Sequence, residues 1–296
     1  MHQKNIVYKQ VENEKLSVRE LLQKWLVPKK WQHFLRVEQN ILINGEYKTF
    51  NTIVNNNDNI TMNFDFPPRT DLQKYLPGNG KLNIVYENDD VIVVNKPSGQ
   101  KTHPNLASEN NTLFNDCESY LSKKNQHPYM VHRIDQETSG LVLISKTPYL
   151  VPIFNRQLSS KTLQREYLAI VDLDQPINDS DIIDQPIGLD SLDKRKRMVR
   201  EDGQNAKTKY QVLEKNPKQA LLDLKLYTGR THQLRVHLSN NGWPIVNDPL
   251  YNSNLQTGSL KLFAYKLTYQ VPFTNQIKEV QVDTPNFMKL TKNMRV

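Results

Sequence analysis

The amino-acid sequence predicts an α+β protein with a small N-terminal domain and a larger, strand-rich domain. Short stretches of alternating apolar and polar residues outnumber the amphipathic helical stretches. A connector rich in Pro and Gly, residues 66–81, separates residues 1–65 from residues 82–296. No expected strand leads into a G-x-G-x-x-G pattern, which disfavours a doubly wound nucleotide-binding domain. We therefore expect two domains, and we expect a chain that starts near Gly80 to fold by itself.

Composition restricts the classes of partner and site. The 296 residues carry a formal net charge of +8, which favours a polyanionic partner over an acidic metabolite. The single cysteine, Cys117, excludes an internal disulfide and a thiolate zinc site. The N-terminal residues contain no apolar signal segment, and no stretch is long and apolar enough to span a membrane. We expect a monomeric cytoplasmic protein without membrane contact.

The N-terminal region contains signals for two helices and a small hairpin sheet. Ser17-x-x-Glu20 is a capping box that opens the first helix, and Pro28 separates it from a second apolar stripe. Asn44-Gly45 predicts a hairpin turn, and residues 60–64 alternate as a half-buried strand does. Four basic residues could follow a phosphate backbone or could simply form a solvated face: Lys24, Lys29, Lys30 and Arg36.

Four short patterns in this region together resemble the S-four-type RNA-binding domain. They are residues 16–22, Leu35-Arg36, residues 43–45 and Asp58-x-Ile60. The resemblance implies that the N-terminal domain binds RNA, and it favours the phosphate-binding interpretation of the basic residues.

In the larger domain, a polar loop at residues 132–139 lies between the entering segment 128–131 and a short apolar strand, residues 141–144. One interpretation is a surface turn in which Asp135 caps the backbone and Gly140 supplies a positive φ. The order His-Arg-Ile-Asp-x-x-Thr-Ser-Gly also resembles the catalytic loop of the RluA-type pseudouridine synthases, with Ile134 in place of their usual Leu.

Three further segments resemble motifs of the same family in the same order. Residues 95–99 match Lys-Pro-x-Gly, Arg165-x-Tyr167 matches Lys-x-Tyr-x-Ala with Arg for Lys, and residues 229–237 match Gly-Arg-x-His-Gln-x-Arg-x-His. A basic run at residues 193–200 is expected to be an exposed loop, where RNA contact and plain solvation are equally plausible. A metal site at His232 and His237 is disfavoured, because residues five apart do not share one helix face.

The resemblance implies a site of one acid, one phenol and one arginine. Asp135 would be the catalytic carboxylate, Arg230 would keep it ionised, and Tyr167 would stack on the base and help to remove its C5 proton. Arg133 would enter the RNA when the target base flips out, and Leu234 would form the floor under that base. The further residues expected to bind substrate are His132, Thr138, Gln233, Arg235 and Lys96.

The same resemblance implies a pseudouridine synthase fold with a central mixed, mostly antiparallel sheet. It also implies isomerisation of uridine to pseudouridine in structured RNA, a reaction for which we expect no cofactor and no metal. Ribosomal RNA of the large subunit is the preferred target, and transfer RNA is the alternative. A non-catalytic RNA-binding or ribosome-assembly factor that keeps the fold is a further alternative; loss of Asp135 would have favoured it, and Asp135 is present.

Overall fold

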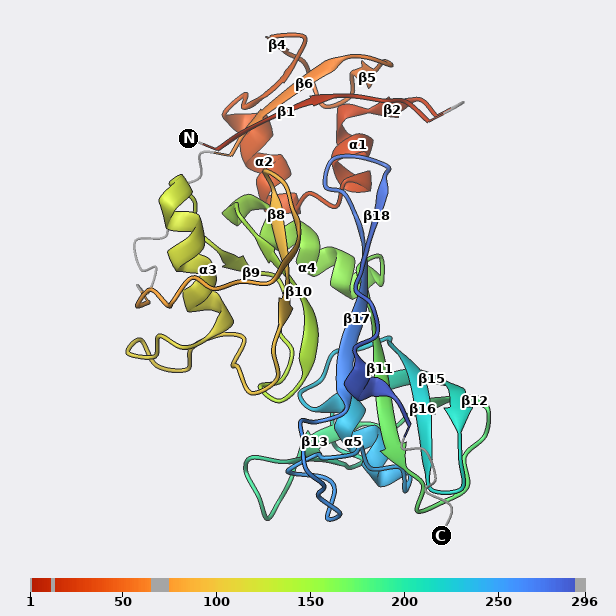
Figure 1. Ribbon diagram of the computed structural model, residues 1–296. Helices are drawn as coiled ribbons and strands as arrows, with labels where there is room; N and C mark the ends of the chain where they lie inside the picture. The colour runs from red at the N-terminus through yellow and green to blue at the C-terminus, as the bar shows by residue number, and fades with distance from the viewer. Residues whose placement is uncertain (1, 12–13, 65–74, 291–296) are drawn as a thin grey trace.

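A computed structural model of the protein describes residues 2–11, 14–64 and 75–290 (Figure 1). It confirms an α+β fold with a small N-terminal unit above a larger sheet domain. More than half of the predicted connector, residues 66–74, lies outside the described residues, and residues 75–83 adopt neither helix nor strand. No helix in the described ranges is long and apolar enough to cross a bilayer.

The N-terminal unit combines two short helices with a four-stranded antiparallel sheet of order β1-β6-β3-β4. The predicted capping box is present, since the Ser17 hydroxyl accepts from Glu20 N and the Glu20 carboxylate accepts from Ser17 N. Asn44 and Gly45 have φ values of 53° and 85°, as the predicted hairpin turn requires. The elements are β1 (Gln3–Val7), β2 (Leu16–Ser17), α1 (Val18–Lys24), α2 (Lys29–Val37), β3 (Ile41–Ile43), β4 (Glu46–Tyr47), β5 (Ile53–Val54) and β6 (Asn59–Asn63).

The larger domain is organised around a sheet with the strand order β12-β15-β16-β11-β17-β10-β8-β7. Two more strands join it, because β18 pairs with β17 and β9 pairs with β10. The strands are β7 (Ile84–Glu87), β8 (Val91–Lys96), β9 (Tyr129–Met130), β10 (Ser139–Ser145), β11 (Gln164–Asp172), β12 (Ser180–Asp184), β15 (Lys207–Lys215), β16 (Gln219–Leu226), β17 (Leu262–Gln270) and β18 (Ile277–Gln281).

Strands β10 and β17 pair in parallel, and every other described pairing of this sheet is antiparallel. The expected mixed, mostly antiparallel sheet is thereby confirmed. Gly140 of β10 has φ +117°, and a Cβ there would lie 2.3 Å from the Ala264 carbonyl oxygen. A side chain cannot fit at this contact, so glycine allows the two strands to meet directly after the polar loop.

Helices and a small hairpin complete the larger domain. Three helices begin near residues 113, 151 and 233, and Thr112 caps the first of them. Part of the basic run forms a strand, where a loop was expected, because residues 197–199 pair with residues 187–189. The elements are α3 (Leu113–Leu121), α4 (Val151–Ser160), β13 (Ile187–Leu189), β14 (Arg197–Val199) and α5 (Gln233–Asn240).

The two units share one hydrophobic core, which the sequence did not predict. The ring of Phe64 stacks on Tyr149 with centroids 4.5 Å apart, and Trp25 meets Phe273 edge-on at 5.7 Å. The buried cluster that contains these residues extends from α1 and β6 into β8, β10, α4 and β17. Lys4 also forms an ion pair with Asp90 at 2.6 Å. We therefore expect the N-terminal unit to support the stability of the larger domain.

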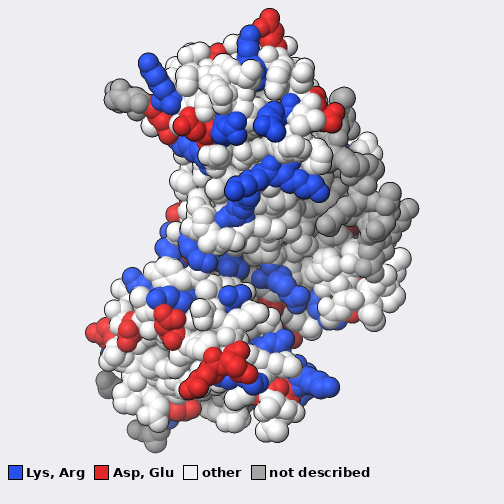
Figure 2. All heavy atoms as spheres, turned by 180° about the vertical axis from the view of Figure 1, so that it is seen from behind, with Lys and Arg blue, Asp and Glu red and all other residues white. Residues whose placement is uncertain are grey.

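Basic side chains are unevenly distributed over the surface. Figure 2 shows Lys and Arg gathered across the middle of one face, from the N-terminal unit into the larger domain. Asp and Glu on this face lie mainly toward its two ends. A band of one sign attracts a polyanion along its length.

Candidate functional site: the Asp135 loop and its cavity

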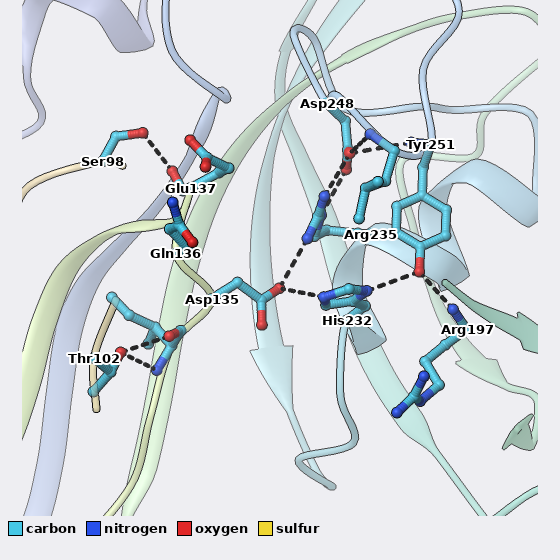
Figure 3. A network of polar contacts seen from close by, with 12 residues as sticks. Ser98, Thr102, Asp135, Gln136, Glu137, Arg197, His232, Arg235, Asp248 and Tyr251 are labelled. Carbon is cyan, nitrogen blue, oxygen red and sulfur yellow. Dashed lines mark hydrogen bonds and ion pairs between the residues drawn. The ribbon is translucent and has the colours of Figure 1, made fainter. Parts of the chain in front are cut away.

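Asp135 lies on the loop between β9 and β10, and hydrogen bonds hold the main chain on both sides of it (Figure 3). The Thr102 hydroxyl donates to the Ile134 carbonyl at 2.6 Å. On the other side, the Ser98 hydroxyl donates to the Glu137 carbonyl at 2.6 Å. Since both anchors hold backbone atoms, the direction of the Asp135 side chain is fixed by the neighbouring chain segment.

Lys96 is a third anchor of the loop. Its ammonium donates to the carbonyls of Pro97 and Gln100 at 2.7 Å each, and to the carbonyl of Gln136 at 2.9 Å. These three bonds use all its donors, and the side chain is 0% exposed. Burial lowers the pKa of Lys96 to about 8. With all its donors used inside the protein, the buried ammonium of Lys96 has none left for a ligand, which argues against the expectation that it binds substrate.

Arg235 of α5 is the arginine that pairs with Asp135 (Figure 3). Its Nη1 lies 3.3 Å from Asp135 Oδ2, while Nε and Nη2 form a fork with the Asp248 carboxylate at 2.8 and 2.7 Å. Both Arg235 and Asp248 are buried. One guanidinium thus joins two carboxylates, and the fork to Asp248 fixes the nitrogen that faces Asp135.

The structure corrects the expectation that Arg230 pairs with Asp135. Arg230 lies on the loop before α5, and its Nε donates to the Asn205 carbonyl at 2.9 Å. Its side chain is exposed at the edge of the same cavity. Because α5 begins only at Gln233, the helix turns Arg235 inward and leaves Arg230 outside. Any role of Arg230 is therefore separate from holding Asp135.

His232 approaches Asp135 from another side and completes a chain of polar contacts (Figure 3). The main-chain N–H of Arg197 donates to the Tyr251 hydroxyl at 2.7 Å, and that oxygen lies 2.9 Å from His232 Nδ1. The hydroxyl hydrogen is then directed to Nδ1, which places the ring proton on Nε2. Nε2 faces Asp135 Oδ2 at 4.0 Å. Burial is the largest cause that lowers the pKa of His232, so the ring is neutral at pH 7.

A cavity of about 120 Å³ opens next to Asp135. Tyr167 of β11 and Leu234 of α5 are buried side chains of its wall, and Arg133 is exposed at its edge. The structure thus brings together Asp135, Tyr167, Leu234, Arg133, Arg230, Arg235, Gln233 and Thr138 around one space. Among the described residues that line it, Asp135 is the one carboxylate.

Tyr167 offers this cavity a protonated phenol. Burial raises its pKa and the nearby Asp135 adds to the rise, against the opposing effect of Arg165. A phenol with a raised pKa donates a hydrogen bond at neutral pH and rarely exists as phenolate. Tyr167 can therefore stack on a base and donate to it, whereas direct proton removal would require a neutral oxygen to act as the base.

Two other residues expected to bind substrate instead stabilise the fold. His132 Nε2 accepts from the Leu143 main-chain N–H at 3.0 Å, and burial lowers its pKa to about 3. The Gln233 amide accepts from Thr228 and from the Arg230 main chain, and donates to Lys207 and Thr208. All four of its hydrogen-bonding positions are used, so Gln233 has none left for a ligand.

The basic residues of the N-terminal unit are not equivalent. Lys29, Lys30 and Arg36 are exposed and have no ion pair among the residues that the structure describes. Lys24 is half-buried and pairs with Glu14, so its charge is already compensated. Of the four predicted residues, these three remain available to an RNA backbone.

Sequence reasoning missed several residues of this site. Asp248, Tyr251 and Thr102 received no role, and His232 was weighed only as a metal ligand. The short sequence separation of Asp248 and Tyr251 from the third motif was an available signal, since it favours a position near α5. In the described part of the chain, no group of three or more His, Cys, Asp or Glu side chains could hold a metal ion.

Comparisons with known proteins show the family of this chain. Residues 90–240 match the family model described as RNA pseudouridylate synthase, and residues 5–60 match the model of the RluD ribosomal pseudouridine synthase N-terminal domain. The uncharacterized RNA pseudouridine synthase YlyB of Bacillus subtilis is 35% identical over 263 residues, which cover 86% of each chain. Ribosomal large subunit pseudouridine synthase D of Nitrosomonas europaea is 38% identical over 172 residues, or 57% of this chain and 49% of that protein.

The fold has a similar solved structure. The human RNA pseudouridylate synthase domain containing 1 superposes with a TM-score of 0.59 at 25% sequence identity, covering 71% of this chain and 86% of that one. The two family models match in the predicted order along the chain, and the Asp135 loop lies within the match to residues 90–240. The chain belongs to the RNA pseudouridine synthase family, whose members are RNA isomerases.

Proposed function

We propose that this protein converts uridine to pseudouridine in large-subunit ribosomal RNA, with Asp135 as its catalytic carboxylate. The observation that carries the proposal is the position of Asp135. It is ion-paired to the buried Arg235 and held beside a cavity that also contains Tyr167. The names of the similar synthase D proteins, which refer to the large ribosomal subunit, support the choice of RNA.

The chemistry is an isomerisation that these side chains can support. The bond from N1 to C1′ breaks, the base turns, C5 bonds to C1′, and the proton of C5 is replaced by one on N1. The reaction requires a group that traps or stabilises the detached state, and an ionised carboxylate can do so as a nucleophile or as a base. Arg235 orients Asp135 through a charge-assisted hydrogen bond.

The remaining contacts suit a base taken out of an RNA helix. The apolar side chain of Leu234 would lie under the base, and the exposed Arg133 would occupy the space that the flipped base leaves. Thr138 is available at the cavity wall. The exposed Lys29, Lys30 and Arg36 would contact phosphates further along the RNA. We expect a monomer that acts in the cytoplasm.

The test is a map of pseudouridines in total RNA from cells that lack the gene and from the same cells with the gene restored. We expect one or a few positions in large-subunit ribosomal RNA to revert to uridine without the gene and to return with it. If pseudouridines are lost only from transfer RNA, transfer RNA replaces large-subunit ribosomal RNA as the substrate. An unchanged map would contradict the proposal and favour a role in RNA binding or ribosome assembly.

A further inference from the structure

Arg165 and Arg230 line the edge of the Asp135 cavity, and Lys161 lies near enough for their charges to act on it. Lys161 ends α4 with φ 65°, Arg165 is the second residue of β11, and Arg230 lies on the loop before α5. A Cβ at Gly229 would lie only 2.9 Å from Arg165 Nη2. The Arg165 guanidinium therefore lies against the backbone just before Arg230.

The three charges are close enough to affect one another. Burial lowers the pKa of Lys161 first, and the charges of Arg165 and Arg230 lower it further. The field of Arg165 also adds to the effect of burial in lowering the pKa of His132. Like charges held together raise the free energy of the unbound protein, and an anion placed among them relieves this cost.

No carboxylate compensates these charges. In the described parts of the chain, Lys161, Arg165 and Arg230 have no ion-pair partner. Some basic residues elsewhere are compensated, because Lys207 pairs with Asp184 at 2.8 Å and Lys215 pairs with Asp179 at 2.9 Å. Arg165 and Arg230 thus present uncompensated charge at the cavity.

The arrangement suits a phosphodiester. Arg230 uses Nε for the Asn205 carbonyl, which leaves its terminal nitrogens for a ligand, and Arg165 presents a planar guanidinium. Planar guanidinium groups match the two non-bridging oxygens of a phosphate, and a lysine adds a point charge. A base inside the cavity places the phosphates of its own nucleotide at the cavity edge.

We propose that Lys161, Arg165 and Arg230 together bind one backbone phosphate directly adjoining the target uridine. This inference rests on the proposed function and adds a ligand-binding site to it. The site would hold the flipped nucleotide by its backbone, so that Asp135 meets the sugar and base in one orientation.

The experiment pairs protein variants with chemically altered RNA. The RNA is a short fragment around the mapped uridine, with single methylphosphonates that remove the charge of one phosphate at a time. Affinity is measured at several salt concentrations, with the full-length Asp135→Asn protein as the parent so that the RNA is not converted. Lys161→Gln and Arg165→Gln are the test variants. Lys215→Gln is the matched control, because Lys215 lies at the end of β15 away from the cavity and is already paired.

With unmodified RNA, each test variant should weaken binding roughly tenfold at low salt. It should also flatten the log-log salt dependence by about 0.7 to 0.9, the slope of one lost phosphate contact. With a methylphosphonate at one phosphate adjoining the uridine, the same variants should weaken binding less than about twofold. A methylphosphonate four nucleotides away should leave the tenfold effect intact.

The inference would be overturned if the test variants weakened binding equally whichever phosphate carried the methylphosphonate. It would also be overturned if Lys215→Gln lost as much affinity as the test variants, which would indicate a general effect of charge. Failure of the proposed function would appear differently. In that case the wild-type protein would form no pseudouridine, whatever affinities the variants show for the altered RNAs.

Discussion

Replacing Arg235 with Gln should damage this protein far more than replacing Arg230 with Gln. Arg235 is 3% exposed and bridges Asp135 to the fully buried Asp248. Arg230 is exposed and makes one side-chain hydrogen bond, to the Asn205 carbonyl. The pair of variants separates the arginine that the structure joins to Asp135 from the one that the sequence favoured.

The contacts set the expected magnitudes. Arg235→Gln removes both bonds of the fork to Asp248 and leaves that buried carboxylate without a countercharge, a loss of about 3 to 5 kcal/mol of unfolding free energy. For a protein of this size that corresponds to a fall in Tm of roughly 6 to 20 °C. Arg230→Gln removes one hydrogen bond at the surface, which is worth about 1 kcal/mol or less.

Thermal unfolding and turnover measured on both variants test this reasoning. Release of the C5 proton from RNA labelled at that position reports turnover, measured at a temperature at which both variants are folded. We expect Arg235→Gln to lose about 100-fold or more of its turnover, because Asp135 is no longer oriented and has lost its countercharge. Equal losses of Tm, or a larger loss of turnover in Arg230→Gln with Arg235→Gln near normal, would refute the assignment.

Three further predictions follow from other contacts. Since burial lowers the pKa of Lys96 to about 8, its ammonium loses a proton in the folded protein as the pH rises through 8, and the amine can then hold only two of the three carbonyls. Turnover should therefore fall above about pH 8. The unfolded chain binds more protons than the folded chain at this pH, so deprotonation of Lys96 does not lower stability. A loss of activity that follows a loss of stability would contradict the explanation. Tyr167→Phe should lower turnover by about 10² to 10⁴ at nearly unchanged RNA affinity if the hydroxyl takes part in proton movement, and an unchanged rate would leave Tyr167 a packing role. A chain that starts at Gly80 exposes the surface that packs against Phe64 and Trp25, so it should aggregate or unfold at a markedly lower temperature; a soluble, cooperative unit with unchanged Tm would contradict the importance of the shared core.

Local features of the fold could be predicted because they depend on near neighbours. The capping box of Ser17 and Glu20 spans four residues, and the Asn44-Gly45 turn spans two. The loop around Asp135 was recognisable for the same reason, since its reactive groups and its flanking strand are contiguous in the sequence. Patterns of this length predict local structure without information about distant contacts.

Contacts between distant segments could not be predicted in this way. Arg230 and Arg235 both belong to the third motif, and only the start of α5 decides which of them turns toward Asp135. The packing of Trp25 against Phe273 likewise depends on which apolar faces meet in space. Periodicity shows that a face is apolar without naming what covers it, so the two units looked separable in sequence.

Anchoring residues were a related difficulty. Lys96 and Gln233 stand in motifs whose overall pattern suggests ligand binding, yet their polar groups are consumed by backbone and neighbouring side chains. A motif marks residues that are needed together, and tertiary contacts decide which of them face the ligand and which hold the others in place.

The central claim is that Asp135 carries the chemistry, and the most direct measurement is single-turnover conversion of the mapped uridine by the Asp135→Asn protein. Asn keeps the size and polarity of the side chain and removes its charge, while the anchors from Thr102, Ser98 and Lys96 hold the backbone and do not depend on it. We expect folded protein that binds the RNA and forms no detectable pseudouridine, beside rapid conversion by the wild type. Appreciable pseudouridine formation by Asp135→Asn would contradict the claim.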